Sequence, residues 1–252
     1  MSIESASATT ISSMTTSSTT HVTPKPKTTT RINVTTLQRL RWILNTFYYQ
    51  LMATLTLVMF WCFFDNSATT QPIFTTHLVL STIAYIPLMA VSIILFSEDN
   101  VTTLYIPRTN RNWIHGVLLI ISAVLVTIGI AVEISEKSKV NRRHFTSKHA
   151  IYGLSSWVLI FVSLLLGVIV ANTRTFSMFV RPILAKFIHN LLGLAAFALG
   201  LASIYVELGF FKMYHMSDHL LVGVKTLFIL LSVWSGLTAL YSLAHQFLSL
   251  FR

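Results

Sequence analysis

Four of the nine histidines in this chain occupy corresponding places, because each falls near the start of a long apolar segment. These four are His77, His115, His149 and His189. A single histidine at the end of a membrane helix is more often an interfacial residue or a cap than a ligand. Four in the same position predict a shared role. If the segments are consecutive antiparallel helices, His77 and His149 lie at one face of the membrane, and His115 and His189 lie at the other.

Two imidazoles that face each other across a helical bundle suit the axial ligation of an iron porphyrin. Each neutral ring donates one nitrogen to one side of the planar macrocycle. Filling both axial positions leaves no site for oxygen or peroxide, so such a centre passes single electrons. Two pairs near the faces of a ~30 Å hydrocarbon core would hold irons on the order of 20 Å apart. The arrangement predicts a route for electrons across a membrane.

Other metal chemistry fits these residues less well. Zinc needs three or four ligands around one ion, and a set divided between two faces cannot supply them. The single cysteine, Cys62, excludes a disulfide framework, a cysteine-ligated zinc or iron-sulfur centre, and covalent haem attachment through C-x-x-C-H. The remaining histidines receive no ligand role, and they are His21, His144, His215, His219 and His245. No catalytic side chain is assigned.

The composition of the chain places these segments in a lipid bilayer. The sequence is 54% hydrophobic and 10% charged, against roughly 45–50% and about 25% in an average soluble domain. A net charge of +10 could suggest nucleic acid, but the basic residues form short clusters between long uncharged runs, as membrane-flanking cations do. We therefore expect contact with lipid and no nucleic-acid partner.

Six intervals without charged residues are long enough to cross the bilayer as helices, which takes about 20 residues. They are bracketed by Arg41 and Asp65, Asp65 and Glu98, Arg111 and Glu133, Lys148 and Arg174, Lys186 and Glu207, and, for the last, about Leu220 and Leu250. Their length and their lack of period-two alternation argue against a β-barrel. The predicted fold is an all-α membrane protein, a bundle of six transmembrane helices.

The first 36 residues differ from the rest of the chain, since 19 of them are Ser or Thr. Such a composition cannot bury enough apolar area to offset chain entropy. We therefore expect a disordered, Ser/Thr-rich tail over residues 1–36 and a transmembrane domain over residues 37–252. An even number of spans puts both termini on one side, and the distribution of basic residues favours the cytoplasm for that side.

Short strings around the four histidines follow one another on consecutive predicted helices. They are His77 followed later by Ser97-Glu98-Asp99, then Trp113-Ile114-His115, then His144-Phe145-Thr146-Ser147-Lys148-His149 with Gly153, and Lys186-Phe187-Ile188-His189 with Gly193. In order and spacing these strings resemble the cytochrome b561 family, in particular its short domain-containing transmembrane reductases, from the first helix to the sixth. One departure is Thr76-His77-Leu78, where the family has Trp-His-Pro.

The resemblance implies two b-type haems (heme b) and a transmembrane oxidoreductase that takes electrons from cytosolic ascorbate. Its acceptor on the far side would be monodehydroascorbate or ferric iron, as a ferric chelate. The resemblance also implies that His77 and His149 hold the non-cytoplasmic haem, and that His115 and His189 hold the cytoplasmic one. An integral multi-pass protein of this family would lie in the ER, in vesicles or in the plasma membrane, and a homodimer is left open.

Three basic residues stand close to the histidines along the chain and are candidate substrate-binding residues. Ascorbate is an anion, so its site should offer cations near the cytoplasmic haem. Arg111 lies one helical turn before His115, and Lys186 lies one turn before His189. On the other face, Lys148 is placed to serve an anionic acceptor. All three are equally typical of bases that flank membrane helices.

Small and aromatic residues on the same helices admit two interpretations. Gly153, Gly193 and Gly200 lack a side chain that would obstruct a flat macrocycle, and close helix contact explains them equally well. Tyr85 and Trp157 lie between the two levels of histidine, where an aromatic ring more often packs in the core or contacts lipid than carries electrons.

Two alternatives to an electron carrier stay open at this point. A transporter or channel would use intramembrane histidines to relay protons or to bind a cation. It would be favoured by inverted repeats or by broken helices, of which Pro87 is the only obvious sign. The other alternative is a structural member of the family that binds haem but has no donor site.

Overall fold

The computed structural model describes residues 35–65, 72–97, 100–176, 181–209 and 216–251. Every regular element in these ranges is helical. The predicted Ser/Thr-rich tail falls, up to residue 34, outside the described residues, so its disorder stays a prediction.

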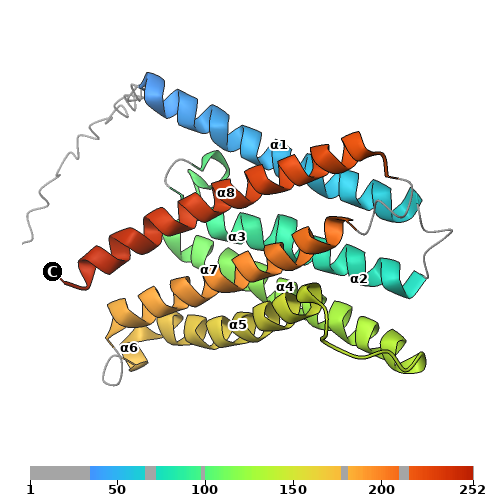
Figure 1. The fold of residues 1–252 in the computed structure, drawn as a ribbon. Coiled ribbons are helices and arrows are strands. Elements are labelled where there is room, and N and C mark those ends of the chain that lie inside the picture. Colours follow the sequence, from blue (N-terminus) through green and yellow to red (C-terminus); the bar gives the residue numbers. More distant parts are fainter. Residues whose placement is uncertain (1–34, 66–71, 98–99, 177–180, 210–215, 252) are drawn as a thin grey trace, which may run out of the picture. The chain divides into compact units, whose positions relative to one another are not determined.

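Within the described ranges, six helical spans are long and apolar enough to cross a membrane (Figure 1). They are α1 (Thr36–Asp65), the second span formed by α2 (Pro72–Ile83), η1 (Ala84–Met89) and α3 (Ala90–Ile94), then α4 (Arg108–Lys139), α5 (Lys148–Ala171), α7 (Pro182–Glu207) and α8 (Asp218–Ser249). Two short helices lie between spans, η2 (Val101–Thr103) and α6 (Thr173–Phe176). The prediction of an all-α, six-helix integral membrane protein is confirmed.

Two of the histidine-bearing helices begin earlier than their flanking charges predict. α4 begins at Arg108, directly after Pro107, and α7 begins at Pro182. Proline suits the first turn of a helix, because its missing N–H has no partner there. The long basic side chains of the first turn can extend from the helix toward water. His115 and His189 therefore lie about two turns inside their helices, deeper than the opening turn where the sequence placed them.

The start of α5 lies where the charges predict, and it is fixed by a side-chain cap. The hydroxyl of Ser147 accepts a hydrogen bond from the backbone N–H of Ala150, at 3.2 Å. This is the usual way in which a serine satisfies a free donor in the first turn. His149 is therefore the second residue of its helix and keeps its predicted place near one membrane face.

The second span contains a π-helical stretch, η1, around Pro87. Proline cannot donate the hydrogen bond that would continue an α-helix and its ring crowds the preceding turn. The chain responds by widening one turn, which adds a residue to it. From α4, the hydroxyl of Ser122 donates to the carbonyl oxygen of Ala84 at 3.2 Å. The second span therefore continues as a helix through Pro87, where the sequence suggested a break.

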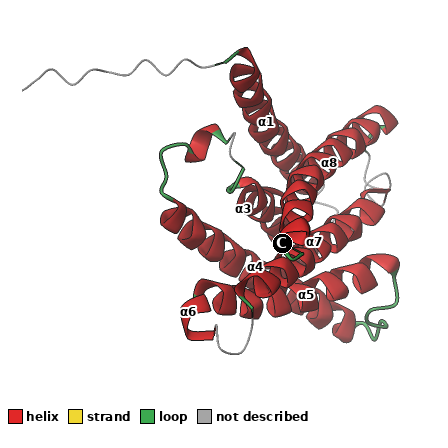
Figure 2. Ribbon diagram, turned by 90° about the vertical axis from the view of Figure 1, so that its left-hand side faces the viewer, coloured by secondary structure: helices red, strands yellow, loops and turns green. Residues whose placement is uncertain are grey.

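The four histidine-bearing spans pack in two antiparallel pairs. α5 lies along α7, and α2 lies along α4. α1 and α8 pack against each other along one side of this group (Figures 1 and 2). There the hydroxyl groups of Tyr48 and Ser235 are 2.7 Å apart and link α1 to α8. Large apolar side chains such as Leu57, Leu165 and Leu237 remain exposed, as expected for surfaces that face lipid.

Candidate functional site

The structure brings His77 and His149 together from α2 and α5. Their ring centres are 5.9 Å apart and their ring planes are inclined by 83°. The Nδ1–H of His77 donates to the carbonyl oxygen of Gly129 on α4 at 2.9 Å. The Nδ1–H of His149 donates to the carbonyl oxygen of Ser203 on α7 at 3.0 Å. Each ring is thus held by a helix that belongs to its own antiparallel pair.

The structure brings His115 and His189 together in the same way, from α4 and α7. Their ring centres are 6.1 Å apart and their planes are inclined by 75°. The Nδ1–H of His115 donates to the carbonyl oxygen of Ser92 at 3.1 Å. The Nδ1–H of His189 donates to the carbonyl oxygen of Ser163 at 2.9 Å. Both pairings expected from helix direction are therefore present in the structure.

The hydrogen bonds fix which ring nitrogen is free in all four histidines. A carbonyl oxygen can only accept, so Nδ1 must carry the hydrogen, and in a neutral ring the lone pair of Nε2 is left for a metal. Ligating histidines usually have this partner on the other nitrogen. The ring centres of the two pairs are 5.9 and 6.1 Å apart. Such a separation leaves room for one metal ion between the two Nε2 atoms, with metal-nitrogen bonds of about 2 Å each. The donor sets fit two bis-imidazole metal centres.

The same donor sets do not fit zinc. Among the residues that the structure describes, no group of three or more His, Cys, Asp or Glu side chains could hold a metal ion. A planar macrocycle supplies four nitrogen ligands of its own and needs only two from the protein. Pairs of histidines are therefore what a haem protein requires, and they are too few for a structural zinc site.

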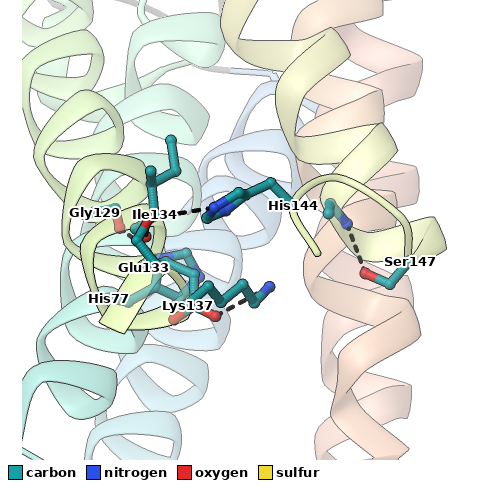
Figure 3. Close-up of polar contacts among 9 residues, drawn as sticks. His77, Gly129, Glu133, Ile134, Lys137, His144 and Ser147 are labelled. Carbon is teal, nitrogen blue, oxygen red and sulfur yellow. Dashed lines mark hydrogen bonds and ion pairs between the residues drawn. The ribbon is translucent and has the colours of Figure 1, made fainter. Parts of the chain in front are cut away.

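A pocket opens beside the His77 and His149 pair and contains charged side chains. It is lined by both histidines and by residues of α4 and of the loop that follows, among them Glu133, Lys137 and His144. Lys137 and Glu133 form an ion pair at 3.1 Å, one turn apart on α4 (Figure 3). Both histidines of this pair line the pocket, so it is the space that a haem held by them would occupy, with both charges in its lining.

His144 reaches from the loop toward α4 at the rim of this pocket (Figure 3). Its Nε2 lies 3.2 Å from the hydroxyl of Ser138. Its Nδ1 is buried and has no hydrogen-bond partner within the described part of the chain. The sequence interpretation gave His144 no role. Its position five residues before His149, in the string His144-Phe145-Thr146-Ser147-Lys148-His149, was the signal that could have placed it here.

The three candidate substrate-binding residues divide between the two ends of the bundle. Arg111 is half-buried one turn before His115, and its Nε donates to the carbonyl oxygen of Ile106 at 2.9 Å. Lys186 is half-buried on α7, one turn before His189. Lys148 is exposed at the first position of α5. Two cations therefore stand on the helices of one histidine pair, and one cation stands next to the other pair.

The glycines of α5 and α7 serve close helix contact. A Cβ atom on Gly153 would lie 3.2 Å from the hydroxyl oxygen of Ser203, and one on Gly193 would lie 3.3 Å from that of Ser163. A Cβ atom on Gly200 would overlap the ring of Tyr85. The structure shows close packing at all three, and Gly153 also lines the pocket of the His77 and His149 pair, so both interpretations stay open for it.

The two aromatic residues between the histidine levels belong to the core. Tyr85 is buried, and its hydroxyl lies 2.7 Å from that of Ser156. The indole N–H of Trp157 donates to the hydroxyl of Thr127 at 2.9 Å and so joins α5 to α4. Both rings therefore cross-link the helices at mid-span, in agreement with the core role that the sequence favoured.

Comparison with known proteins adds one match. A family model described as eukaryotic cytochrome b561 matches residues 76–214. The match covers more than half of the 252 residues and includes all four paired histidines. A search of curated proteins gave no match.

Proposed function

This chain belongs to the eukaryotic cytochrome b561 family, and from that premise we propose a specific electron donor, acceptor and pair of haem sites. Membership in the family means that the protein binds b-type haem and transfers electrons across a membrane. We propose that ascorbate in the cytoplasm donates the electrons. Monodehydroascorbate or a ferric chelate on the other side receives them. The protein is then an ascorbate-dependent transmembrane oxidoreductase.

The observation that carries this proposal is the presence of two matched histidine pairs on the same four helices. We assign one haem to His77 and His149 and a second to His115 and His189. A haem held by each pair would supply one-electron redox chemistry. The chain contributes the fixed Nδ1–H bonds, which hold each ring with Nε2 turned away from its carbonyl partner.

The donor end of the proposed pathway is that of His115 and His189. Arg111 and Lys186 stand one turn before these histidines and raise the local concentration of an anion such as ascorbate. The side is cytoplasmic if both termini are, which the basic residues of the sequence favour. The same arrangement places the basic residues near the starts of α4 and α7, Arg108 and Lys186, at the membrane surface.

The acceptor end is that of His77 and His149, where the pocket lies. Lys137 and His144 line the pocket, and Lys148 is exposed next to His149. All three can attract or hydrogen-bond an anionic acceptor, while Glu133 balances the charge of Lys137. The haem assigned to His77 and His149 would occupy this pocket, so a small polar acceptor would meet these charged side chains beside the haem rather than in its place. We place monodehydroascorbate or a ferric chelate there.

The experiment that tests this proposal uses the purified holoprotein in sealed vesicles with a ferric chelate trapped inside and ascorbate added outside. We expect ferrous iron to form inside, at a rate that depends on the amount of haem-loaded protein. Vesicles without protein, and vesicles with His115→Ala protein, serve as controls. Haem that dithionite reduces but ascorbate does not would contradict the proposed donor.

A further inference from the structure

A repeated pattern of residues relates the four helices that carry the paired histidines. Each histidine is followed seven residues later by Ser or Ala. After a further seven residues, or eight in the second span, comes Ser or Gly. The four sets are His149, Ser156 and Ser163 on α5; His189, Ala196 and Ser203 on α7; His115, Ser122 and Gly129 on α4; and His77, Ala84 and Ser92 on the second span. Residues seven apart lie on the same face of a helix, so each set forms one stripe.

The second span departs from this spacing by one residue, and the π-helical stretch explains why. Ser92 follows Ala84 after eight residues rather than seven, and η1 (Ala84–Met89) lies between the two. A π-helical turn accommodates one extra residue. The widened turn at Pro87 therefore returns Ser92 to the face that the other three stripes occupy.

The stripes of α5 and α7 contact each other through three repeated hydrogen bonds. At the ends, the Nδ1–H groups of His149 and His189 donate to the carbonyls of Ser203 and Ser163. In the middle, the hydroxyl of Ser156 donates to the carbonyl of Ala196 at 2.6 Å. Two histidine bonds and one central serine bond thus join this pair.

The stripes of the second span and α4 repeat the same three bonds. His77 donates to Gly129 and His115 donates to Ser92. In the middle, Ser122 donates to the carbonyl of Ala84. The two helix pairs therefore share one pattern. Apart from the extra residue at η1, their stripes differ in one residue type, because α4 carries Gly129 in place of a serine.

The serines at the ends of the stripes do more than supply a carbonyl. The hydroxyl oxygen of Ser92 lies 2.8 Å from Nδ1 of His115. That of Ser203 lies 3.0 Å from Nδ1 of His149, and that of Ser163 lies 3.3 Å from Nδ1 of His189.

Two of these hydroxyls also donate a hydrogen bond back to their histidine. Ser203 donates to the carbonyl of His149 at 2.8 Å, and Ser163 donates to that of His189 at 3.4 Å. Because the hydroxyl hydrogen is used in this way, a lone pair of the same oxygen faces Nδ1–H. The ring hydrogen then has two acceptors, a carbonyl and a hydroxyl.

We propose that Ser92, Ser163 and Ser203 are positioning residues that set the electron-donor strength of their histidines, and that Gly129 leaves His77 as the one ligand without this hydroxyl. The inference rests on the proposed histidine pairs. Acceptors at Nδ1 make the imidazole a stronger ligand, which favours the oxidised iron and lowers its reduction potential. The His115 and His189 site has two such hydroxyls, and the His77 and His149 site has one.

The first test removes one hydroxyl at a time from the purified holoprotein and follows a redox titration by visible spectroscopy. Ser203→Ala should move the potential of the His77 and His149 haem to a more positive value and weaken haem binding there by about 10-fold or more. Ser163→Ala should do the same at the other haem. Ser203→Thr keeps the hydroxyl and should restore the parent potential.

A matched control separates this effect from helix packing. Ser122→Ala removes a buried serine that bonds a carbonyl of the neighbouring helix without touching a histidine. It should leave both potentials unchanged. If Ser122→Ala moved the potentials as much as Ser163→Ala or Ser203→Ala, the hydroxyls would act through packing and the inference would be wrong.

The sharpest test adds the hydroxyl that is missing at Gly129. A Cβ atom there would lie 3.4 Å from the hydroxyl of Ser81 and 3.6 Å from Nδ1 of His77, which are ordinary contacts. Gly129→Ser should therefore fit and move only the His77 and His149 haem, to a more negative potential. Gly129→Ala adds the methyl group alone and should not.

The outcomes separate the role of the hydroxyls from the histidine assignment. The parent protein could bind two haems and lose one when a histidine is replaced, while the serine and Gly129 substitutions leave both potentials unchanged. That result would overturn the role of the hydroxyls alone. A parent protein without two haems would overturn the histidine assignment itself.

Discussion

The two histidine pairs are alike in how their rings are held and different in what surrounds them. In both pairs the ring centres are about 6 Å apart and every Nδ1–H donates to a backbone carbonyl of a neighbouring helix. The His77 and His149 pair adjoins a pocket with Glu133, Lys137 and His144. The other pair has two cations a turn away. The shared features are those that any ligating imidazole needs, and the differences are what can give each end its own partner.

The largest expected effect comes from removing one histidine. His115→Ala or His189→Ala should abolish the haem at that end and leave the other haem largely bound, because the two pairs share no ligand. Haem per chain, measured by its pyridine complex in protein that inserts and folds, should fall by half. Equal loss of both haems from either variant would contradict two separate sites.

A second prediction concerns the middle of the bundle, which both ends share. Gly200→Ala puts a methyl group where the ring of Tyr85 lies. Overpacking of this kind typically costs 1–3 kcal/mol, so we expect a lower melting temperature in detergent and parallel loss of both haems on heating. Gly236→Ala on α8, where a Cβ atom meets nothing within 4 Å among the described residues, is the matched control. Equal melting temperatures of the two variants would show that a methyl group at Gly200 does not clash with the ring of Tyr85.

A smaller effect should distinguish the charged surroundings of the two ends. Replacing Arg111 and Lys186 together by Gln should slow reduction by ascorbate about 10-fold. Added salt should reduce the difference in rate between variant and parent, because it screens the attraction between ascorbate and the two cations of the parent. A neutral reductant should be affected much less. Lys148→Gln, at the other end, is the control and should leave reduction by ascorbate unchanged.

The stopped-flow comparison of the two reductants decides the outcome. A displaced helix or an altered haem potential would slow both reductants equally. Equal slowing, or no slowing with either, would remove Arg111 and Lys186 from the donor site without affecting the haem assignment.

The smallest effect is expected from deleting the Ser/Thr-rich tail, which has too few apolar residues to pack against either end of the bundle. Deletion of residues 1–30 should leave the haem content and the rate of reduction by ascorbate at the parent values. Spectra and rates of protein purified from membranes give the answer. A change in either quantity would show that the tail contributes to the site.

The sequence was sufficient for the six spans and for the pairing of the histidines. Charge-free intervals marked the spans because charged side chains are costly in lipid, and antiparallel order alone put His77 with His149. Helix starts were less predictable, since Arg108 in the first turn of α4 and Lys186 at the fifth residue of α7 have side chains long enough to reach the interface. The effect of Pro87 was also missed, because a proline can widen a turn as well as end a helix.

The partners of the histidine rings could not be predicted from the sequence interpretation. Backbone carbonyls belong to every residue, so Gly129 and Ser163 carry no side-chain signal for accepting a ring N–H. A serine in a membrane helix is also a common partner of its own helix backbone, as Ser232 is for Phe228. The recurrence of Ser or Gly two heptads after each histidine was the available signal, and the extra residue at η1 obscured it in the second span.

The most direct test of the account is the ratio of haem to chain in the purified parent protein, taken with its reduced-minus-oxidised spectrum. Two histidine pairs of the same geometry predict two b-type haems per chain. A ratio of one would show that only one pair holds haem, and a ratio near zero in folded protein would contradict the haem assignment at both ends.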